Sequence, residues 1–167
     1  MPRILISDEL SPNATKVFER RGVEVDRLPG LTSEQLALRI ADYDGLAIRS
    51  ATKVTEQIIL GARNLKVIGR AGIGVDNVDL DVATAAGIVV MNTPFGNAIT
   101  TAEHAISMIC SLAREITTAD TSTQSGKWEK SRFMGTELTG KNLGIIGCGN
   151  IGSIVADRGQ GLRMRVL

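Results

Sequence analysis

Three glycines with the spacing Gly147-x-Gly149-x-x-Gly152 carry the clearest chemical meaning in this chain. A strand-like apolar run, residues 143–146, precedes them, and a helical stretch from Ser153 follows. In a dinucleotide-binding βαβ unit the first glycine permits a tight turn, the second lets the main chain approach a pyrophosphate, and the third lets the helix pack closely. The N–H groups at the helix start attract the anion. The pattern predicts dinucleotide binding; a glycine-rich turn of purely structural use is the alternative.

The acidic residue that binds the cofactor ribose usually lies about 20 residues beyond the first glycine, at the end of the next strand. Asp157 is too early and falls inside the predicted helix, and the next strand has only begun at Val166-Leu167. We therefore expect the ribose acid beyond Leu167, which leaves NAD and NADP open on the residues alone. Gly159 and Gly161 are expected to weaken the helix by roughly 1 kcal/mol each.

A candidate anion site follows two strand-like runs of the N-terminal half. Arg49-Ser50 ends the run 45–48, and a glycine-rich segment, 69–79, follows the run 65–68. Open α/β sheets bind ligands at the carboxyl ends of their strands. Arg49 and the Ser50 hydroxyl suit a phosphate or carboxylate, and the small residues of the second segment expose N–H groups able to hold a carboxylate. A solvated arginine and a merely tight turn are the alternatives.

The remaining reactive residues show no comparable pattern. His104, the single histidine, has no second histidine or metal spacing beside it, so we expect no catalytic role for it. Cys148 is expected to be a small filler between two glycines, and with Cys110 it forms neither a metal site nor a disulfide framework. Trp128 would contact an anionic ligand or another subunit, or form an ordinary surface cluster, with Lys127, Lys130 and Arg132.

The composition is that of a soluble globular protein. The 167 residues are 43% hydrophobic and 22% charged, with a formal net charge of +1. This balance gives no reason to expect nucleic acid or an anionic membrane surface as a partner. The N-terminal apolar run is too short for a signal peptide, and no run approaches the roughly 18 apolar residues of a membrane span. We expect a cytoplasmic protein.

Alternating strand-like and helical runs predict a parallel α/β sheet over residues 1–95. Ser11-Pro12 indicates the N-cap and first residue of one helix, and Thr32 with Gln35 indicates the capping box of another. The fold class predicted for this part is α/β, flavodoxin-like, with five strands: Arg3–Ser7, Val23–Val25, Gly45–Ile48, Leu65–Ile68 and Ile88–Met91.

A second α/β domain is expected to begin within residues 96–167. Thr100 with Glu103 predicts the capping box of a long amphipathic helix. The polar segment 117–140 is typical of an arm or connector. From Lys141 onward, the strand, glycine turn and helix predict the first βα unit of a Rossmann nucleotide-binding domain.

Several strings match one known family and together cover essentially the whole chain: 48–55, 67–80, 90–94 with 96–97, 101–104, 126–129 and 133–138. On these segments the chain resembles the D-isomer-specific 2-hydroxyacid dehydrogenases. Within that family it is similar to the branch that acts on 3-phosphoglycerate, because of the Arg49-Ser50 pair and segment 128–138. The glycine turn is shared by the broad family.

The resemblance implies a substrate domain over residues 1–95, a hinge near Asn97, and the truncated start of an NAD-binding domain over residues 96–167. It implies NAD as the cofactor. The substrate-binding residues that it implies are Arg49, Ser50, Arg70, Ala71, Gly72 and Ile73. The cofactor-binding residues that it implies are Ile73, Gly147, Gly149, Asn150, Ile151 and Gly152.

The activity implied by the resemblance is NAD-dependent oxidation of 3-phosphoglycerate to 3-phosphohydroxypyruvate, a step of serine biosynthesis. The segment 117–140 resembles the family's dimer contact, which implies a homo-oligomer, dimer or tetramer, with Lys130 or Arg132 near the partner's phosphate site. The family's catalytic arginine, glutamate and histidine are expected beyond Leu167. The chain alone is therefore expected to be inactive and to bind NAD weakly.

Two other functions stay open. One is a sibling oxidoreductase, such as a glyoxylate/hydroxypyruvate reductase or a D-lactate dehydrogenase; Arg49 discriminates, because a phosphate-binding arginine matters less for an unphosphorylated acid. The other is a non-catalytic nucleotide-sensing or corepressor-like protein of the same fold. No metal site is expected.

Overall fold

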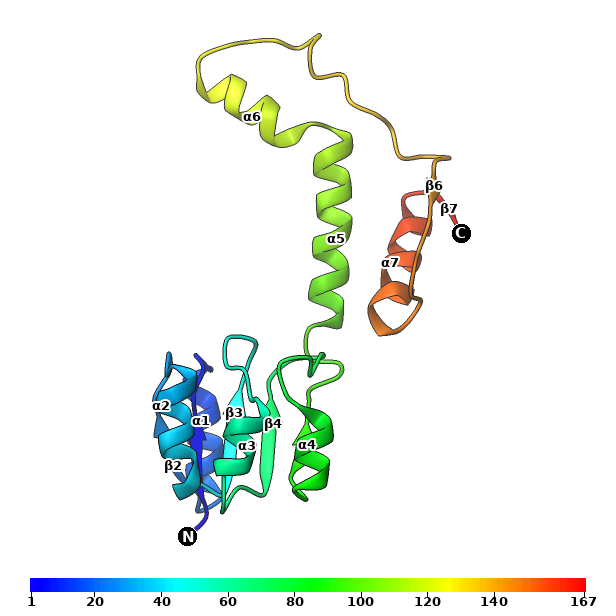
Figure 1. Ribbon diagram of the computed structural model, residues 1–167. Helices are drawn as coiled ribbons and strands as arrows, with labels where there is room; N and C mark the ends of the chain where they lie inside the picture. The colour runs from blue at the N-terminus through cyan, green and yellow to red at the C-terminus, as the bar shows by residue number, and fades with distance from the viewer. The chain divides into compact units, whose positions relative to one another are not determined.

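The computed structural model describes all 167 residues, and the chain divides into two compact units, Met1–Gly96 and Asn97–Leu167 (Figure 1). This division is adjacent to the boundary expected between residues 95 and 96. The roles expected for the two parts, substrate domain and nucleotide domain, stay predictions. None of the helices combines the length and the apolar character that a membrane-spanning helix needs.

The first unit is built on one parallel sheet with the strand order β2-β1-β3-β4-β5. Its strands are β1 Arg3–Ile6, β2 Glu24–Arg27, β3 Gly45–Ile48, β4 Val67–Arg70 and β5 Val89–Met91. This is the order of flavodoxin-like doubly wound sheets, so the predicted fold class is confirmed. All four residues of β3 are buried, because this central strand is covered on both faces.

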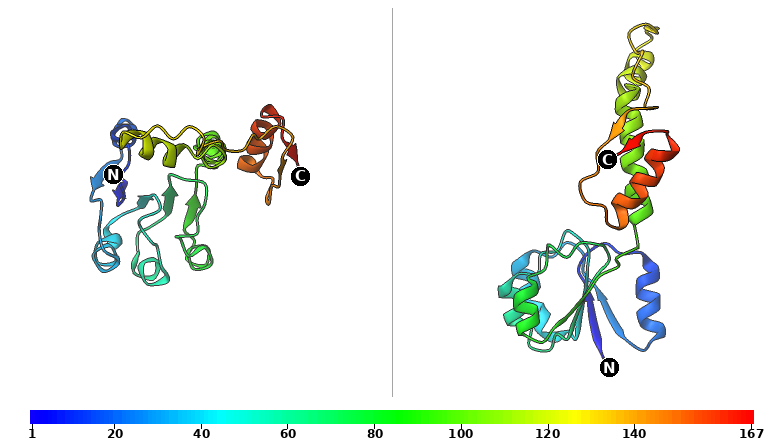
Figure 2. Two further views of the ribbon diagram at one scale, coloured as in Figure 1. Left: turned by 90° about the horizontal axis from the view of Figure 1, so that it is seen from above. Right: turned by 90° about the vertical axis from the view of Figure 1, so that its right-hand side faces the viewer.

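Helices flank the sheet on both faces: α1 Pro12–Arg20, α2 Ser33–Arg39, the short 3₁₀ helix η1 Ile40–Asp42, α3 Glu56–Gly61 and α4 Leu80–Ala85. Figure 2 shows α2, α3 and α4 over one face and α1 over the other. The predicted caps are confirmed: Ser11 accepts from the N–H of Asn13, and Thr32 and Gln35 form a reciprocal capping box. The buried core lies between the sheet and the three-helix layer, and includes Leu5, Leu46, Ile48, Ile58 and Ile68.

The second unit contains α5 Ala98–Ala113, α6 Ile116–Gln124, β6 Asn142–Leu143, α7 Asn150–Gly161 and β7 Arg165–Val166. Helix α5 packs against α7, and β6 and β7 pair in parallel. Glu115, in the left-handed region with φ 52°, separates α5 from α6. Strand–turn–helix–strand from β6 to β7 is the βα arrangement predicted for this part.

Two local predictions in the second unit are wrong. The capping box at Thr100 and Glu103 does not form, because α5 already begins at Ala98 and its N-cap, Asn97, makes no side-chain bond. Helix α7 begins at Asn150 instead of Ser153, so the glycine turn leads into the helix directly. The segment 117–140, expected to be an arm or connector, contains most of α6, and no residue of that helix is buried.

The glycines expected to weaken α7 do not interrupt it, since the helix continues to Gly161. Gly159 is buried, and a Cβ there would lie 2.5 Å from Cδ2 of Leu143 in β6. The missing side chain therefore lets α7 pack closely on its strand. No such neighbour surrounds Gly161.

Candidate functional site

The candidate anion site lies at the carboxyl edge of the first unit's sheet, where β1 and β3 end side by side. These two strands lead to helices on opposite faces, α1 from β1 and α3 from β3 (Figure 2). Such a switch point is where open α/β sheets bind ligands. The chain places Asp8 just after β1 and Arg49-Ser50 just after β3. Arg49 and Ser50, predicted to lie at the carboxyl edge of the sheet, therefore lie at the switch point of this fold.

Arg49 and Ser50 are both exposed at this edge, on a loop whose ends are held from two sides. The buried carboxylate of Asp8, after β1, accepts hydrogen bonds from the main-chain N–H of Arg49 (2.5 Å) and of Thr52 (3.2 Å). The side-chain amide Nδ2 of Asn77, in the loop after β4, donates to the carbonyls of Arg49 (2.7 Å) and Thr52 (2.6 Å). The main chain under Arg49 is therefore fixed while its guanidinium faces solvent, which suits it to bind an anion.

Arg70, predicted to bind substrate, points its guanidinium into its own loop. Its Nη1 donates to the carbonyl of Gly74, its Nη2 lies 3.8 Å from Oδ1 of Asp76, and its side chain is 12% exposed. A Cβ at Gly74 would lie 3.1 Å from Nη1 and 2.9 Å from the Asp76 carboxylate. In this structure Arg70 stabilises the loop 71–76, and its Nε is buried without a hydrogen-bond partner.

The predicted backbone cradle is half occupied by the protein itself. The N–H of Ala71 donates to the carbonyl of Ile48, and that of Gly72 donates to the carbonyl of Arg70. The N–H groups of Ile73 and Gly74 have no main-chain acceptor. Of the predicted residues Ala71, Gly72 and Ile73, only Ile73 therefore offers a free amide to a ligand, and Gly74 offers a second one that the sequence did not single out.

The cradle is tied to the end of β5. The side-chain amide of Asn92 donates to the carbonyl of Ile73 (2.7 Å), and the main-chain N–H of Thr93 donates to the carbonyl of Gly72 (2.9 Å). The loops after β1, β3, β4 and β5 thus form one connected hydrogen-bond network. The loops at the carboxyl edge of the sheet are therefore largely ordered before a ligand binds.

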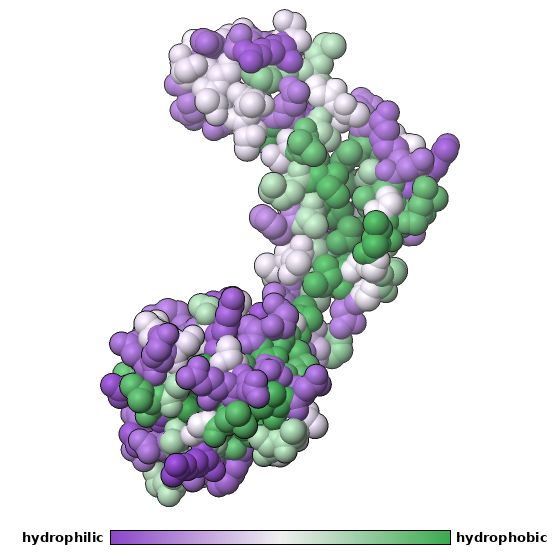
Figure 3. Space-filling model, in the orientation of Figure 1, coloured by the Kyte–Doolittle hydropathy of each residue, from purple (hydrophilic) through white to green (hydrophobic).

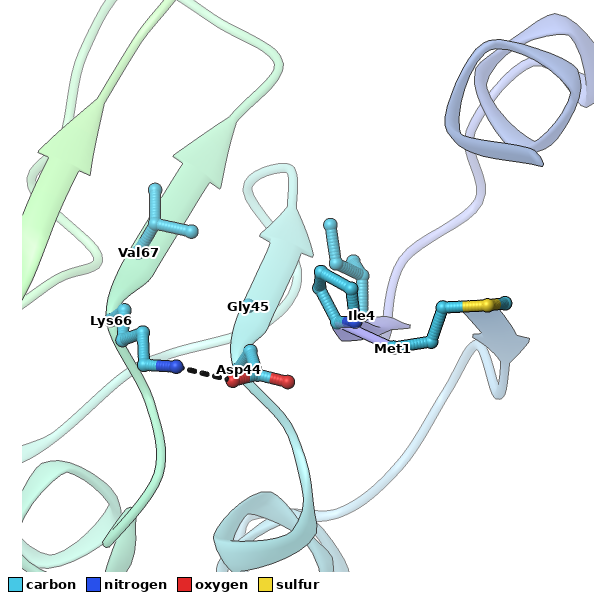
Figure 4. A pocket seen from close by; sticks show the side chains of 7 residues that line it. Met1, Ile4, Asp44, Gly45, Lys66 and Val67 are labelled. Atoms are coloured by element: carbon cyan, nitrogen blue, oxygen red, sulfur yellow. Dashed lines mark hydrogen bonds and ion pairs between the residues drawn. The ribbon is translucent and has the colours of Figure 1, made fainter. Parts of the chain in front are cut away.

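Two surface hollows lie on the first unit, and the first of them is lined in part by Ser50. One, of about 640 Å³ at the carboxyl edge, presents the Lys53 ammonium together with the carboxylates of Glu56, Asp76 and Asp79. Its acidic excess makes it unsuited to a phosphate. The other, of about 490 Å³, lies at the opposite edge of the sheet, where Lys66 pairs with Asp44 beside the first residues of the chain (Figure 4). The first hollow includes one residue predicted to bind substrate, Ser50, and the second includes none.

In the second unit the glycine turn has the features expected of a phosphate loop. Gly147 has φ 93°, in the left-handed region, and a Cβ at Gly152 would lie 2.1 Å from the Gly147 carbonyl. Gly149 is different, because it has ordinary extended dihedrals and no atom lies within 4 Å of the place that a Cβ would occupy. Helix α7 receives no side-chain cap, so the N–H groups of Asn150 and Ile151 are available to an anion.

The other residues weighed from the sequence lie apart from these features. His104 is exposed on α5, and Cys110 and Cys148 are both free. Glu129 accepts from Ser122 and pairs with Arg132 at 3.3 Å; the hydrogen bond from the Ser122 hydroxyl is the main reason that its pKa lies below the usual range. The structure contains no group of three or more His, Cys, Asp or Glu side chains able to hold a metal ion.

Sequence reasoning missed the residues that hold the anion loop: Asp8, Thr52 and Asn77. Their side-chain hydrogen-bond partners are 25 to 45 residues away in sequence, so no local pattern reports the contacts. One signal was present: Ser7-Asp8 is a polar pair directly after a buried strand, at the same edge as Arg49.

Comparison with known proteins places the chain in a family. Residues 4–160 match the model of the D-isomer specific 2-hydroxyacid dehydrogenase catalytic domain. The chain is 46% identical over 165 residues to D-3-phosphoglycerate dehydrogenase of Archaeoglobus fulgidus, and 50% identical over 165 residues to that of Homo sapiens; each alignment covers 99% of this chain and 31% of the relative.

The fold is likewise shared with a solved structure of cofactor (NAD+) bound 3-phosphoglycerate dehydrogenase from Entamoeba histolytica. The TM-score is 0.80 at 32% identity, over 99% of this chain and 52% of that one. The chain thus spans less than a third of the length of its curated relatives. The sequence-based resemblance is confirmed: the chain belongs to the D-isomer-specific 2-hydroxyacid dehydrogenase family.

Proposed function

We propose that the protein carrying this chain is an NAD-dependent D-3-phosphoglycerate dehydrogenase, which oxidises 3-phosphoglycerate to 3-phosphohydroxypyruvate in serine biosynthesis. The observation that carries the proposal is the Arg49-Ser50 loop, exposed and fixed at the switch point. Whole-chain identity of 46–50% to relatives of that name supports it.

Arg49 is the residue that we assign to the substrate phosphate. A guanidinium binds phosphate through paired, charge-assisted hydrogen bonds, and the Ser50 hydroxyl adds a further donor. The free N–H groups of Ile73 and Gly74 are suited to the substrate carboxylate. Because Arg70 is engaged by its own loop, we assign it first to holding that cradle.

NAD fits the second unit because Gly149 leaves open space beside an uncapped helix start. The N–H groups of Asn150 and Ile151 would hold the pyrophosphate, while Gly147 and Gly152 shape the turn. When bound, NAD supplies the nicotinamide that accepts a hydride from C2 of the substrate. The catalytic arginine, glutamate and histidine of the family are assigned to the part of the protein outside these 167 residues.

Self-association is the further part of the proposal. Large apolar side chains gather over α5 (Figure 3) and continue onto the following segment: Met108, Leu112, Ile116, Trp128 and Met134. Leu112 is 82% and Trp128 84% exposed. An apolar patch of this kind marks a protein interface, and a second copy of the chain is the partner that we assign to it. Lys130, exposed beside Trp128, is the basic residue best placed to accompany that contact.

The substrate assignment is tested by titrating the 167-residue chain with 3-phosphoglycerate and with D-glycerate, followed by ¹H–¹⁵N NMR. 3-Phosphoglycerate should shift the amides of Arg49 and Ser50, whereas D-glycerate, which lacks the phosphate, should bind more weakly. Arg49→Ala should raise the Kd for 3-phosphoglycerate by about 10- to 100-fold, since a hydrogen bond to a charged group contributes about 1.5–3 kcal/mol.

Arg49→Lys is the matched variant, because it keeps the charge and loses the paired geometry. Its Kd should lie between those of wild type and Arg49→Ala. Equal affinity for the two ligands in wild type, unchanged by Arg49→Ala, would favour a sibling enzyme that acts on an unphosphorylated acid.

A further inference from the structure

A buried carboxylate that no catalytic assignment uses lies directly beneath the anion loop. Asp8 is 5% exposed, and its neighbours Ser7 and Thr52 are 1% and 8% exposed. None of the ion pairs in the structure includes Asp8. Burying a carboxylate without a cation is costly unless hydrogen bonds compensate. The hydrogen-bond partners of Asp8 therefore indicate its role.

All three of those partners belong to the loop after β3. Oδ2 of Asp8 accepts from the main-chain N–H of Arg49 and of Thr52, and Oδ1 accepts from the Thr52 hydroxyl at 2.7 Å. The carboxylate therefore joins the first and last residues of the segment 49–52, and both of its oxygens are occupied from within the protein. Hydrogen bonds to an ionised acceptor are roughly twice as strong as neutral ones.

The direction of the hydrogen bonds in this cluster follows from the chemistry. Because Asp8 is a pure acceptor when ionised, the Thr52 hydroxyl must donate to it. The Ser7 hydroxyl, 2.9 Å from the Thr52 oxygen, then donates to Thr52. An asparagine at position 8 could still accept from both main-chain N–H groups through its oxygen, with its NH₂ donating to Thr52 and Thr52 donating to Ser7. An alanine could do neither.

We propose that Asp8 is the positioning residue of the anion site: its carboxylate holds the main chain of segment 49–52 so that Arg49 and Ser50 face the substrate phosphate. This inference rests on the proposed function, because it assigns the phosphate to Arg49. The preformed loop spares the ligand the entropic cost of ordering it. Asp8 acts through the loop and does not touch the substrate.

The contact itself is tested by amide NMR of the 167-residue chain. In wild type, the amide protons of Arg49 and Thr52 should lie downfield and exchange slowly with solvent, as donors to a buried carboxylate. In Asp8→Ala both signals should move upfield and exchange at least about tenfold faster, because the acceptor is gone. In Asp8→Asn both should stay protected.

The functional part is tested by the Kd for 3-phosphoglycerate in the same samples. Asp8→Ala should raise it about tenfold, the factor that corresponds to ordering a single loop residue on binding, and Asp8→Asn should stay within about threefold of wild type. Asp26→Ala is the control for general destabilisation, since Asp26 is a partly buried carboxylate bonded to Arg3 (2.6 Å) and Tyr43 (2.8 Å), whose contacts lie away from segment 49–52. Its Kd should equal that of wild type.

The outcomes separate this inference from the proposed function. If wild type binds 3-phosphoglycerate and Asp8→Ala binds it equally well, the positioning role is overturned while the proposed function stands. If Asp26→Ala weakens binding as much as Asp8→Ala, the effect is general destabilisation and the inference is likewise overturned. If wild type shows no response to 3-phosphoglycerate or inorganic phosphate, the anion site itself fails, and with it both proposals.

Discussion

At the scale of single residues, the three glycines of the turn have different physical reasons to be glycine. Gly147 needs its left-handed dihedral, and Gly152 needs space because the Gly147 carbonyl occupies the position of a Cβ. Gly149 meets neither requirement within the chain. Nothing within the chain explains a glycine at this position, and the proposed close approach of the pyrophosphate would do so.

This difference predicts opposite results for two matched substitutions. Gly152→Ala should lower the free energy of unfolding by at least about 2 kcal/mol, because a main-chain atom cannot make room cheaply. Gly149→Ala should change it by less than about 0.5 kcal/mol, while raising the Kd for NAD in the full-length protein. Chemical denaturation followed by circular dichroism measures the first two effects. Equal destabilisation by both variants would contradict the separate roles.

The sequence allowed residue-level predictions where the constraint is local. The glycine spacing and the Ser11 and Thr32 caps involve residues at most a few positions apart, and these predictions agree with the structure. The contacts of Asp8 are different. The amides that the Asp8 carboxylate reaches lie 41 and 44 residues away. Arg70 contacts Gly74 in its own loop, but the local sequence does not determine whether its guanidinium faces that loop or a ligand.

At the scale of elements, short polar contacts link the strands of the first unit at their amino ends. The Asp44 carboxylate, just before β3, accepts from the main-chain N–H of Arg3 (3.0 Å) and from Lys66 Nζ (2.7 Å). It thus connects β3 to β1 and β4. The hydrogen bond from Lys66, followed by that from Arg3, holds the pKa of Asp44 below its usual range.

A lowered folded-state pKa makes the contribution of Asp44 to stability depend on pH. The contribution is fully present above the unfolded-state pKa of about 3.9 and is lost as the pH falls through the lower folded-state value. Asp44→Asn should therefore be less stable than wild type at neutral pH, and the difference should shrink in acid. Unfolding free energies across this pH range measure it. The exposed Asp42→Asn is the control, and a wild-type-to-D44N difference that is constant with pH would contradict the account.

Helix boundaries were predictable where periodicity and caps agree, as in the first unit. Strand boundaries were less so: β4, expected over 65–68, runs Val67–Arg70. The start of an apolar helix without a cap was not predictable, because nothing in the sequence of α5 distinguishes Ala98 from Thr100 as its first residue. Similarly, Gly159 resembled a helix breaker until the neighbouring side chain of Leu143 was known. Propensity is a weak guide where tertiary packing determines the choice.

At the scale of the whole molecule, the exposed apolar residues of the second unit predict self-association. The chain should sediment as a dimer or larger species, and Leu112→Glu should shift it toward the monomer, since a charge would be buried in the contact. Leu38→Glu, at a residue 85% exposed in the first unit, is the matched control and should leave the mass unchanged. A monomeric wild type across the accessible concentration range would contradict the assignment of a second copy to this patch.

The central claim, that this chain contributes the substrate site of a phosphoglycerate dehydrogenase, is tested most directly by NADH formation in the full-length protein. 3-Phosphoglycerate and D-lactate are compared as substrates in wild type and Arg49→Ala, with the 167-residue chain alone as a blank that should form no NADH. The account predicts a higher kcat/KM for 3-phosphoglycerate, reduced about 10- to 100-fold by Arg49→Ala, with little change for D-lactate. A wild-type preference for D-lactate, or equal losses for both substrates, would contradict it.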